Sequence, residues 1–242
     1  MSVLLDVRNA SRRFGALMAV NNVSFSVRQG ELLGLIGPNG AGKSTLYNLI
    51  AGVLPPTAGE IVFDGKIVTG WKPYEVARVG IGRTFQIPKP YRQISVVENV
   101  MLTAFLREKS IAGARRLAEA TLADVGLADY FGTPVSALTV GLLKRLEVAR
   151  ALAMQPKLVL FDEIMAGLTP PEVGVMTKFV AGLPARGITV IWVEHVLYAI
   201  MKTASRMIVL NRGELIAEGP PAAMARDPAV VKAYLGEEMD LA

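Results

Sequence analysis

The chain has 242 residues, a net charge of +5 at neutral pH, one histidine and no cysteine, which excludes disulfides and thiol chemistry and argues against a dedicated zinc site. Gly, Pro or charged residues interrupt every apolar stretch before the roughly 18 residues that a membrane-spanning helix needs, and the start has no signal-peptide pattern, which indicates a cytosolic protein. The basic residues form no dense run with interleaved aromatic residues, so a solvated basic surface is favoured over nucleic-acid binding.

The first third of the chain has mainly β-strand patterns around one strand-to-helix unit. A helix is expected directly after the third strand and ends at Pro55-Pro56. Asp64-Gly65 is typical of the two-residue turn of a β-hairpin. The expected strands are residues 4–7, 23–27 and 32–36, followed by the hairpin at residues 61–68.

The remaining two thirds begin with a helical pattern and then alternate between strands and helices. Residues 95–153 have apolar side chains at helical spacing, which predicts a helical insert. Residues 158–161 and 188–193 are short apolar runs rich in branched residues, as expected of strands buried on both faces. A hairpin around residues 211–214 and a last helix over residues 229–235 complete the pattern.

Residues 37–45 form a glycine-rich loop between the third strand and the helix after it. Gly37, Gly42, Lys43 and Ser44 match the G-x-x-x-x-G-K-[ST] phosphate loop. Backbone N–H groups would converge on phosphates at a helix N-terminus, with Lys43 reaching the β and γ phosphates and Ser44 completing a Mg²⁺ site. The alternative, a glycine-rich turn with an exposed lysine, is disfavoured by the flanking strand and helix. The residues expected to hold the nucleotide are Gly37, Pro38, Asn39, Gly40, Ala41, Gly42, Lys43, Ser44 and Thr45.

A second apolar strand pattern ends in two acids, Asp162 and Glu163. Alone such an ending is unremarkable, but together with a phosphate loop it becomes specific. Asp162 is expected to hold Mg²⁺ through water, and Glu163 to act as general base toward an in-line attacking water. Catalysis would then consist of positioning and charge stabilisation, without a covalent intermediate.

His195 follows the strand pattern at residues 188–193. A histidine at a strand end is, taken alone, more often structural. In an open α/β sheet, however, ligands bind beyond the carboxyl ends of the strands, where Asp162 and Glu163 are also expected. We therefore predict that His195 donates a hydrogen bond to the γ-phosphate.

In this order the motifs resemble the ATPase subunits of ABC transporters, over essentially the whole chain. The resemblance implies ATP and Mg²⁺ as cofactors and an α/β fold with a RecA-like P-loop core. That core and an antiparallel β subdomain would cover residues 1–86 and 154–242, and a helical subdomain residues 87–153. It also implies that adenine stacks on Phe14, whose alternative role is a hydrophobic plug, and that Gln86 approaches Mg²⁺ and the attacking water.

The segment after Leu138 resembles the family's signature segment, which binds the γ-phosphate of ATP held by the opposite subunit. Thr139 keeps the hydroxyl and Gly141 the glycine of that segment, so both are expected to contact ATP across the subunit interface. The departures from the family pattern, in the signature and after Glu163, are Val140, Leu142, Leu143, Ile164 and Thr169.

Residues 83–86, 145–150, 165–168 and 233–237 resemble the ATPases of branched-chain amino-acid type importers. That resemblance implies import of branched-chain or related amino acids or of small amides and acids. The implied partners are transmembrane permease subunits, a second and often different ATPase subunit and, indirectly, a substrate-binding protein, with no nucleic acid. The chain would lie peripherally on the cytoplasmic face of the membrane and dock near residues 87–97.

Three functions stay open at this point. In the first, two ATPase chains enclose two ATP molecules, and closure and hydrolysis drive alternating access. In the second, suggested by the altered signature, the chain mainly binds ATP as a regulatory partner. The third is a soluble ABC protein of translation or DNA repair, although the sequence has neither the fused second ATPase domain nor the coiled-coil insertion usual in those proteins. A P-loop GTPase or kinase shares the phosphate loop, but the sequence has no Asn-Lys-x-Asp guanine motif.

Overall fold

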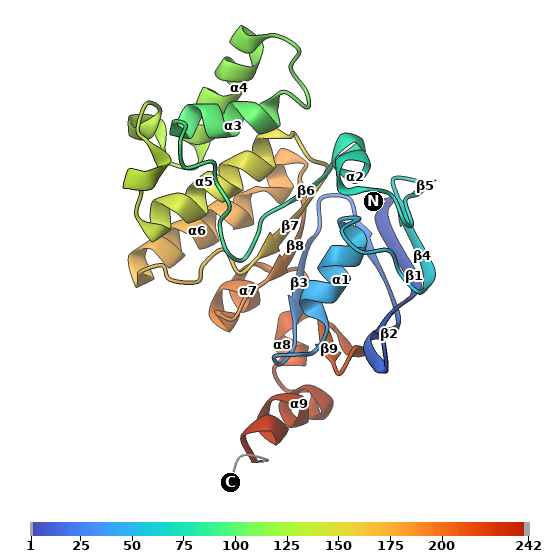
Figure 1. The fold of residues 1–242 in the computed structure, drawn as a ribbon. Coiled ribbons are helices and arrows are strands. Elements are labelled where there is room, and N and C mark those ends of the chain that lie inside the picture. Colours follow the sequence, from blue (N-terminus) through green and yellow to red (C-terminus); the bar gives the residue numbers. More distant parts are fainter. Residues whose placement is uncertain (1, 240–242) are drawn as a thin grey trace.

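The protein is built in three layers around a six-stranded sheet (Figure 1). The computed structural model describes residues 2–239, with side chains described as far as Tyr234. Helices α5 (Val140–Ala153) and α6 (Pro170–Gly182) lie on one side of this sheet, and helix α1 (Lys43–Ile50) lies on the other, against a smaller four-stranded sheet.

The six-stranded sheet has the strand order β10-β9-β3-β8-β7-β6. Its strands are β3 (Leu32–Ile36), β6 (Ile81–Arg83), β7 (Leu158–Asp162), β8 (Thr189–Val193), β9 (Arg206–Asn211) and β10 (Glu214–Gly219). All neighbours pair in parallel except β9 and β10, which are antiparallel. Every residue of β7 and β8 is buried, which confirms the prediction of strands covered on both faces, and every residue of β3 is buried as well. Because these strands are parallel, the loops that follow them meet at one edge of the sheet.

The smaller sheet is antiparallel, with the strand order β2-β1-β4-β5. Its strands are β1 (Val3–Phe14), β2 (Leu17–Arg28), β4 (Ala58–Phe63) and β5 (Lys66–Ile67). β1 and β2 are longer than predicted. Asn9 and Asn22 have positive φ and the register shifts between Val7 and Ala10, and these irregularities interrupt the alternation of apolar and polar residues by which a strand is recognised in the sequence. The predicted hairpin turn is confirmed, since Asp64 and Gly65 both have positive φ.

The predicted helical stretch between residues 95 and 153 consists of three α-helices with loops and short 3-10 turns between them. The remaining helices are α2 (Pro73–Val79), α3 (Val96–Ala104), α4 (Ile111–Asp124), α7 (Leu197–Thr203), α8 (Pro221–Met224) and α9 (Pro228–Met239). The expectation that Pro55-Pro56 ends α1 is wrong: the helix ends at Ile50, and Gly52, with φ of 70°, turns the chain before the prolines. The last helix is confirmed, although the side chains of residues 235–237 lie outside the described residues.

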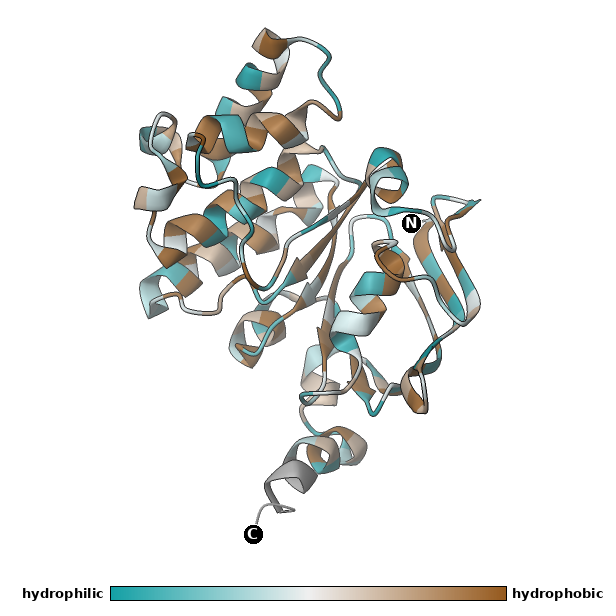
Figure 2. Ribbon diagram, in the orientation of Figure 1, coloured by the Kyte–Doolittle hydropathy of each residue, from teal (hydrophilic) through white to brown (hydrophobic). Residues whose placement is uncertain are grey.

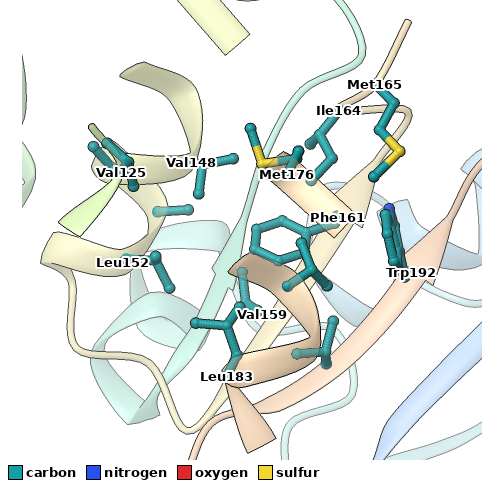
Figure 3. Close-up of a cluster of buried hydrophobic side chains, with 14 of the residues drawn as sticks. Val125, Val148, Leu152, Val159, Phe161, Ile164, Met165, Met176, Leu183 and Trp192 are labelled. Atoms are coloured by element: carbon teal, nitrogen blue, oxygen red, sulfur yellow. The ribbon is translucent and has the colours of Figure 1, made fainter. Parts of the chain in front are cut away.

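The central strands separate two hydrophobic cores. Val159 and Phe161 of β7 point to the side of α5 and α6, while Leu158 and Leu160 belong to the core shared with the smaller sheet and α1. Figure 3 shows Val159 and Phe161 among side chains that include Val148, Leu152 and Leu183. This alternation follows from the two-residue period of a strand. It fixes β7, and the two acids at its end, between two packed layers.

The apolar residues are concentrated in the central strands, whereas the helices combine apolar and polar residues (Figure 2). Within the part of the chain that the structure describes, no helix is both long enough and apolar enough to cross a bilayer.

Candidate functional site

A hollow of about 710 Å³ lies where the phosphate loop meets the edge of the sheet. We call it the phosphate-loop hollow. The residues that line it are Phe14, Leu17, Met18, Ala19, Asn39, Gly40, Ala41, Gly42, Lys43, Ser44, Thr45, Gln86, Glu163 and Arg212. It therefore brings together predicted site residues from four separate parts of the sequence.

The phosphate loop folds as its glycines require. Gly42 is the N-cap of α1 with φ of 102°, and a Cβ there would lie 2.4 Å from the carbonyl oxygen of Ala19. Gly37 has φ of 152°, and a Cβ there would lie 2.1 Å from the carbonyl oxygen of Leu210. Both positions therefore exclude any side chain, and the loop backbone can approach neighbouring groups closely.

Lys43 holds the loop closed from inside. Its Nζ donates hydrogen bonds to the carbonyl oxygens of Gly37 at 2.5 Å and Pro38 at 2.9 Å, and its side chain is buried. These carbonyls are backbone acceptors that an anionic phosphate can replace as the partner of the ammonium group. The lysine is thus positioned at the N-terminus of α1, where backbone N–H groups also favour an anion.

Asp162 lies at the end of β7 with only 4% of its surface exposed. Burial raises the pKa of its carboxyl group, and the nearby charge of Glu163 raises it further, while Arg83 at 3.4 Å lowers it. The backbone N–H of Asp162 donates to Thr84 Oγ1 at 3.1 Å. A second cation near this carboxylate would stabilise its charged form. The Asp162 carboxylate is therefore suited to bind a divalent metal ion through its oxygen atoms.

Glu163, Gln86 and His195 form one hydrogen-bonded cluster at the same edge of the sheet. Gln86 Nε2 donates to Glu163 Oε2 at 2.5 Å, and His195 Nε2 lies 2.9 Å from Glu163 Oε1. Each carboxylate oxygen thus has a partner from a different strand end, because residues 86, 163 and 195 follow parallel strands β6, β7 and β8. The structure thus brings these three predicted residues together.

The predicted metal ligands supply oxygen donors, as Mg²⁺ prefers. Ser44 and Gln86 line the hollow, and Asp162 lies at the end of the neighbouring strand. Among the described residues, no group of three or more His, Asp or Glu side chains could hold a metal ion by itself. A Mg²⁺ ion here would therefore need phosphate oxygens and water to complete its coordination.

The signature segment lies apart from this hollow. Thr139 is the N-cap of α5, and its hydroxyl accepts the N–H of Leu142 at a long 3.4 Å. Gly141 is buried, and a Cβ there would lie 2.3 Å from Oε1 of Glu172 on α6. Neither residue lines the hollow, so the structure does not place them near this chain's own phosphate loop.

Two arginines at the site were not singled out from the sequence. Arg83 pairs with Asp162 and also donates to Asn48 Oδ1 at 2.5 Å. Arg212 lines the hollow from the turn between β9 and β10, where Gly213 N donates to the carbonyl of Ala41 at 3.0 Å. The predicted hairpin at residues 211–214 was the available signal, but only the fold shows that its turn touches the phosphate loop.

Phe14 lies at the mouth of the hollow with 40% of its surface exposed. The guanidinium carbon of Arg12 lies 4.8 Å from the centre of its ring. One face of the ring is thus occupied by a cation, and the side chain is too exposed for a hydrophobic plug. A flat aromatic base has a surface on which to stack at this position.

Comparisons with known proteins agree with these motifs. A family described as "ABC transporter" matches residues 20–166, and one described as "Branched-chain amino acid ATP-binding cassette transporter" matches residues 214–240. The high-affinity branched-chain amino acid transport ATP-binding protein LivG of Salmonella typhimurium is 36% identical, over 97% of this chain and 98% of the relative.

Solved structures give the same result for the fold. An ATP-binding cassette of an ABC transporter in its ADP conformation is 32% identical with a TM-score of 0.87, covering 98% of this chain and 100% of that one. A dimeric ATP-binding cassette in a post-hydrolysis state, bound to ADP and Pi, is 26% identical with a TM-score of 0.82, covering 90% and 99%. The expected P-loop α/β fold is confirmed, and the chain belongs to the ABC transporter family, as one of its ATP-binding subunits.

Proposed function

We propose that this chain binds and hydrolyses ATP to drive the import of branched-chain or related amino acids, or of small amides and acids. The observation that carries the proposal is the carboxylate of Glu163, held between Gln86 and His195 beside the phosphate loop. The family match over residues 214–240 and the similarity to a branched-chain amino acid transport protein support the substrate class.

In this proposal ATP lies along the phosphate-loop hollow. Adenine stacks on Phe14, and the phosphates lie against the backbone N–H groups of residues 39–45. Lys43 exchanges its carbonyl partners, Gly37 and Pro38, for the β and γ phosphate oxygens. Lys43 therefore gives up hydrogen bonds to neutral carbonyl oxygens and gains ion pairs with anionic phosphate oxygens.

Ser44, Gln86 and Asp162 would hold Mg²⁺ together with the phosphates. When bound, the metal neutralises charge that develops on the transferred phosphoryl group. Burial already disfavours the charged form of Asp162, so a second cation beside Arg83 fits this carboxylate.

Glu163 would take the proton of the attacking water, and His195 would donate to the γ-phosphate. Gln86 and His195 fix the two oxygens of the carboxylate, so its orientation is set before the water arrives. Such a preorganised base needs little rearrangement in the transition state. No covalent intermediate is required.

The proposed partners are two transmembrane permease subunits, a second ATPase subunit and, indirectly, a substrate-binding protein. A heterodimer is favoured because Val140, Leu142 and Leu143 alter the signature that would serve the neighbouring site. The chain would then associate peripherally with the permeases, on the cytoplasmic face of the membrane.

We further propose that residues 87–153 form the helical subdomain and carry the permease contact, with the core in residues 1–86 and 154–242. Ile87 and Tyr91 are 73% and 59% exposed, within the predicted docking segment 87–97. Leu102 in α3, Phe105 directly after α3 and Ile111 in α4 are exposed as well. Exposed apolar side chains are the kind of surface that a protein interface covers.

Glu163→Gln tests the catalytic assignment. Gln keeps the shape of the side chain but removes the base, so we expect turnover to fall by about 100-fold to 10,000-fold while ATP binding is retained. The ATPase rate is measured against protein concentration, with ATP affinity measured in parallel. An unchanged rate would exclude Glu163 as the base.

A second candidate function is an ATP-binding regulatory partner that hydrolyses seldom. The altered signature favours it, as does the carboxylate of Glu172 that covers Gly141. Glu163 and His195, however, belong to this chain's own site. In a heterodimer we therefore expect ATP at this chain's phosphate loop to turn over faster than ATP at its partner's, and equal rates at the two sites would contradict this.

A further inference from the structure

A buried lysine on α5 contacts the backbone of both Gln86 and Glu163. Lys144 Nζ donates to the carbonyl oxygen of Gln86 at 2.6 Å and to that of Glu163 at 2.9 Å. Only 3% of the lysine is exposed. One ammonium group therefore bridges the two segments that supply the catalytic carboxylate and its amide partner.

Lys144 belongs to a polar stripe on α5 that faces the chain after Gln86. Glu147 and Arg150 follow at three-residue spacing, which places all three on one side of the helix. Lys89 N donates to Glu147 Oε1 at 3.2 Å, and Arg150 donates to the carbonyl oxygen of Lys89 at 3.0 Å and to Glu147 at 2.6 Å. The backbone of residues 86–89 is thus attached to α5 at both ends.

The charge of Lys144 is unfavourable where it lies. Burial lowers the pKa of its ammonium group, and the surrounding carboxylates Glu194, Glu163, Asp162 and Glu147 oppose that shift. An uncharged apolar side chain would fill a helix-to-sheet interface with less desolvation penalty. What the lysine provides, and a methionine of similar length would not, is a pair of hydrogen bonds that hold the backbones of Gln86 and Glu163 against α5.

The same helix begins with the signature segment. Thr139 is the N-cap of α5 and Lys144 lies in its second turn, so both move with one rigid element. We propose that Lys144 is a positioning residue that fixes Gln86 and Glu163 relative to α5. When ATP held by the partner subunit binds to this chain's signature segment, a movement of α5 would then reposition Gln86 and Glu163 beside the ATP at this chain's own phosphate loop. The inference rests on the proposed roles of Glu163 and of the signature segment.

Lys144→Met in the assembled transporter tests this directly. Loss of both carbonyl bonds lets Gln86 and Glu163 shift, and a misplacement of this kind is expected to lower kcat by about 10-fold to 100-fold. Lys144 lies outside the residues that line the hollow, so KM for ATP should change by less than about threefold. The dependence of the rate on ATP concentration should also lose its cooperativity.

Arg107→Met is the matched control. Arg107 also donates to backbone carbonyls, with Nε 2.7 Å from the carbonyl oxygen of Met154 and Nη1 3.1 Å from that of Arg78, but it does not line the phosphate-loop hollow. We expect it to lower the melting temperature and to leave kcat per folded molecule unchanged. An equal loss of kcat in both variants would overturn the positioning role.

Lys144→Arg and a double variant separate positioning from folding. Lys144→Arg keeps a cation that can reach the carbonyls, so most of kcat and its cooperativity should return. Added to Glu163→Gln, Lys144→Met should lower the single-turnover rate little further, because it acts through the base already removed. Full additivity of the two losses would contradict the inference. If Lys144→Met does not fold, Lys144→Gln takes its place, and an unchanged kcat in that variant would equally contradict it.

The outcome also distinguishes this inference from the proposed function. If Glu163→Gln leaves turnover intact, the assignment of the base fails, whatever Lys144 does. If Glu163→Gln abolishes turnover while Lys144→Met keeps the wild-type kcat and cooperativity, only the role of Lys144 is lost.

Discussion

The phosphate-loop hollow and the signature segment are built differently. At the hollow, Lys43 is bonded within its own loop and Glu163 has a partner on each oxygen. At the signature, one long hydrogen bond caps α5 and Val140 is 55% exposed. The hollow is preassembled within one chain, whereas the signature presents a surface that a second molecule must complete.

The difference follows from where the two regions lie in the fold. The hollow forms at the ends of buried parallel strands, with a hydrophobic core on both faces of the sheet. The signature lies at the first turn of a helix that packs on the core only from Gly141 onward. We therefore expect the residues of the phosphate-loop hollow to be held rigidly and the signature segment to tolerate substitution.

The largest expected contrast concerns stability. Phe161 lies in the strand directly before the catalytic acids and is fully buried. Phe161→Ala should lower the free energy of unfolding by about 3–5 kcal/mol, through lost burial and a cavity. Val140→Ala, at the exposed signature, should stay within about 0.5 kcal/mol of the wild type. Urea denaturation of both variants checks this, and similar midpoint shifts would contradict the contrast.

The predictability of the site follows the same division. The phosphate loop, the two acids at the end of β7 and the histidine after β8 were predictable, because each is a local pattern in or next to a buried apolar strand. Their meeting at one edge was also predictable, since parallel strands present their ends together. The fold class and the order of the main elements followed from the same alternation.

The contacts between distant segments were not predictable. Lys144 bonds residues 58 and 19 positions away, and no local pattern distinguishes it from an exposed lysine on a helix. Arg212 depends on a turn that touches the phosphate loop only in the folded chain. The full lengths of β1 and β2 were hidden because bulges break the two-residue period.

Two glutamates allow a pH test of the same contrast. Burial raises the pKa of Glu194, next to His195, from 4.5 to about 7, and the charge of Glu163 adds to the shift, while the N–H of Met165 opposes it. The folded protein then binds more protons than the unfolded chain between these two values. The free energy of unfolding therefore falls as pH rises through this window, by about 3 kcal/mol from Glu194.

Glu194→Gln removes this titration but keeps an oxygen that can accept the N–H of Met165. Between pH 4.5 and 7 the variant should lose stability less steeply than the wild type, measured by urea denaturation at each pH. Glu172 beside the signature is the control, because hydrogen bonds from Thr169 lower its pKa instead. Glu172→Gln should change the dependence of the unfolding free energy on pH only below pH 4.5. An effect of Glu172→Gln between pH 4.5 and 7 would contradict the difference between the two glutamates.

The smallest expected effect concerns the outer support of the phosphate loop. Gly37 N donates to the hydroxyl of Tyr234 at 2.9 Å, so helix α9 contacts the first glycine of the loop. Tyr234→Phe removes only that hydroxyl and keeps the ring. A single hydrogen bond contributes about 1 kcal/mol, so the dissociation constant for ATP should rise about fivefold.

Tyr198→Phe is the matched control for this prediction, since the hydroxyl of Tyr198 accepts from Lys202 at 3.3 Å on α7 and not from the loop. ATP titration of both variants, with the unfolding free energy measured alongside, separates the two effects. If the loop is fully preassembled by its own contacts, Tyr234→Phe and Tyr198→Phe will bind ATP equally well. A selective loss of affinity in Tyr234→Phe would show that the preassembled site extends to the last helix. The geometry of residues 37–45 would then depend on a contact with a residue 197 positions further along the chain than Gly37.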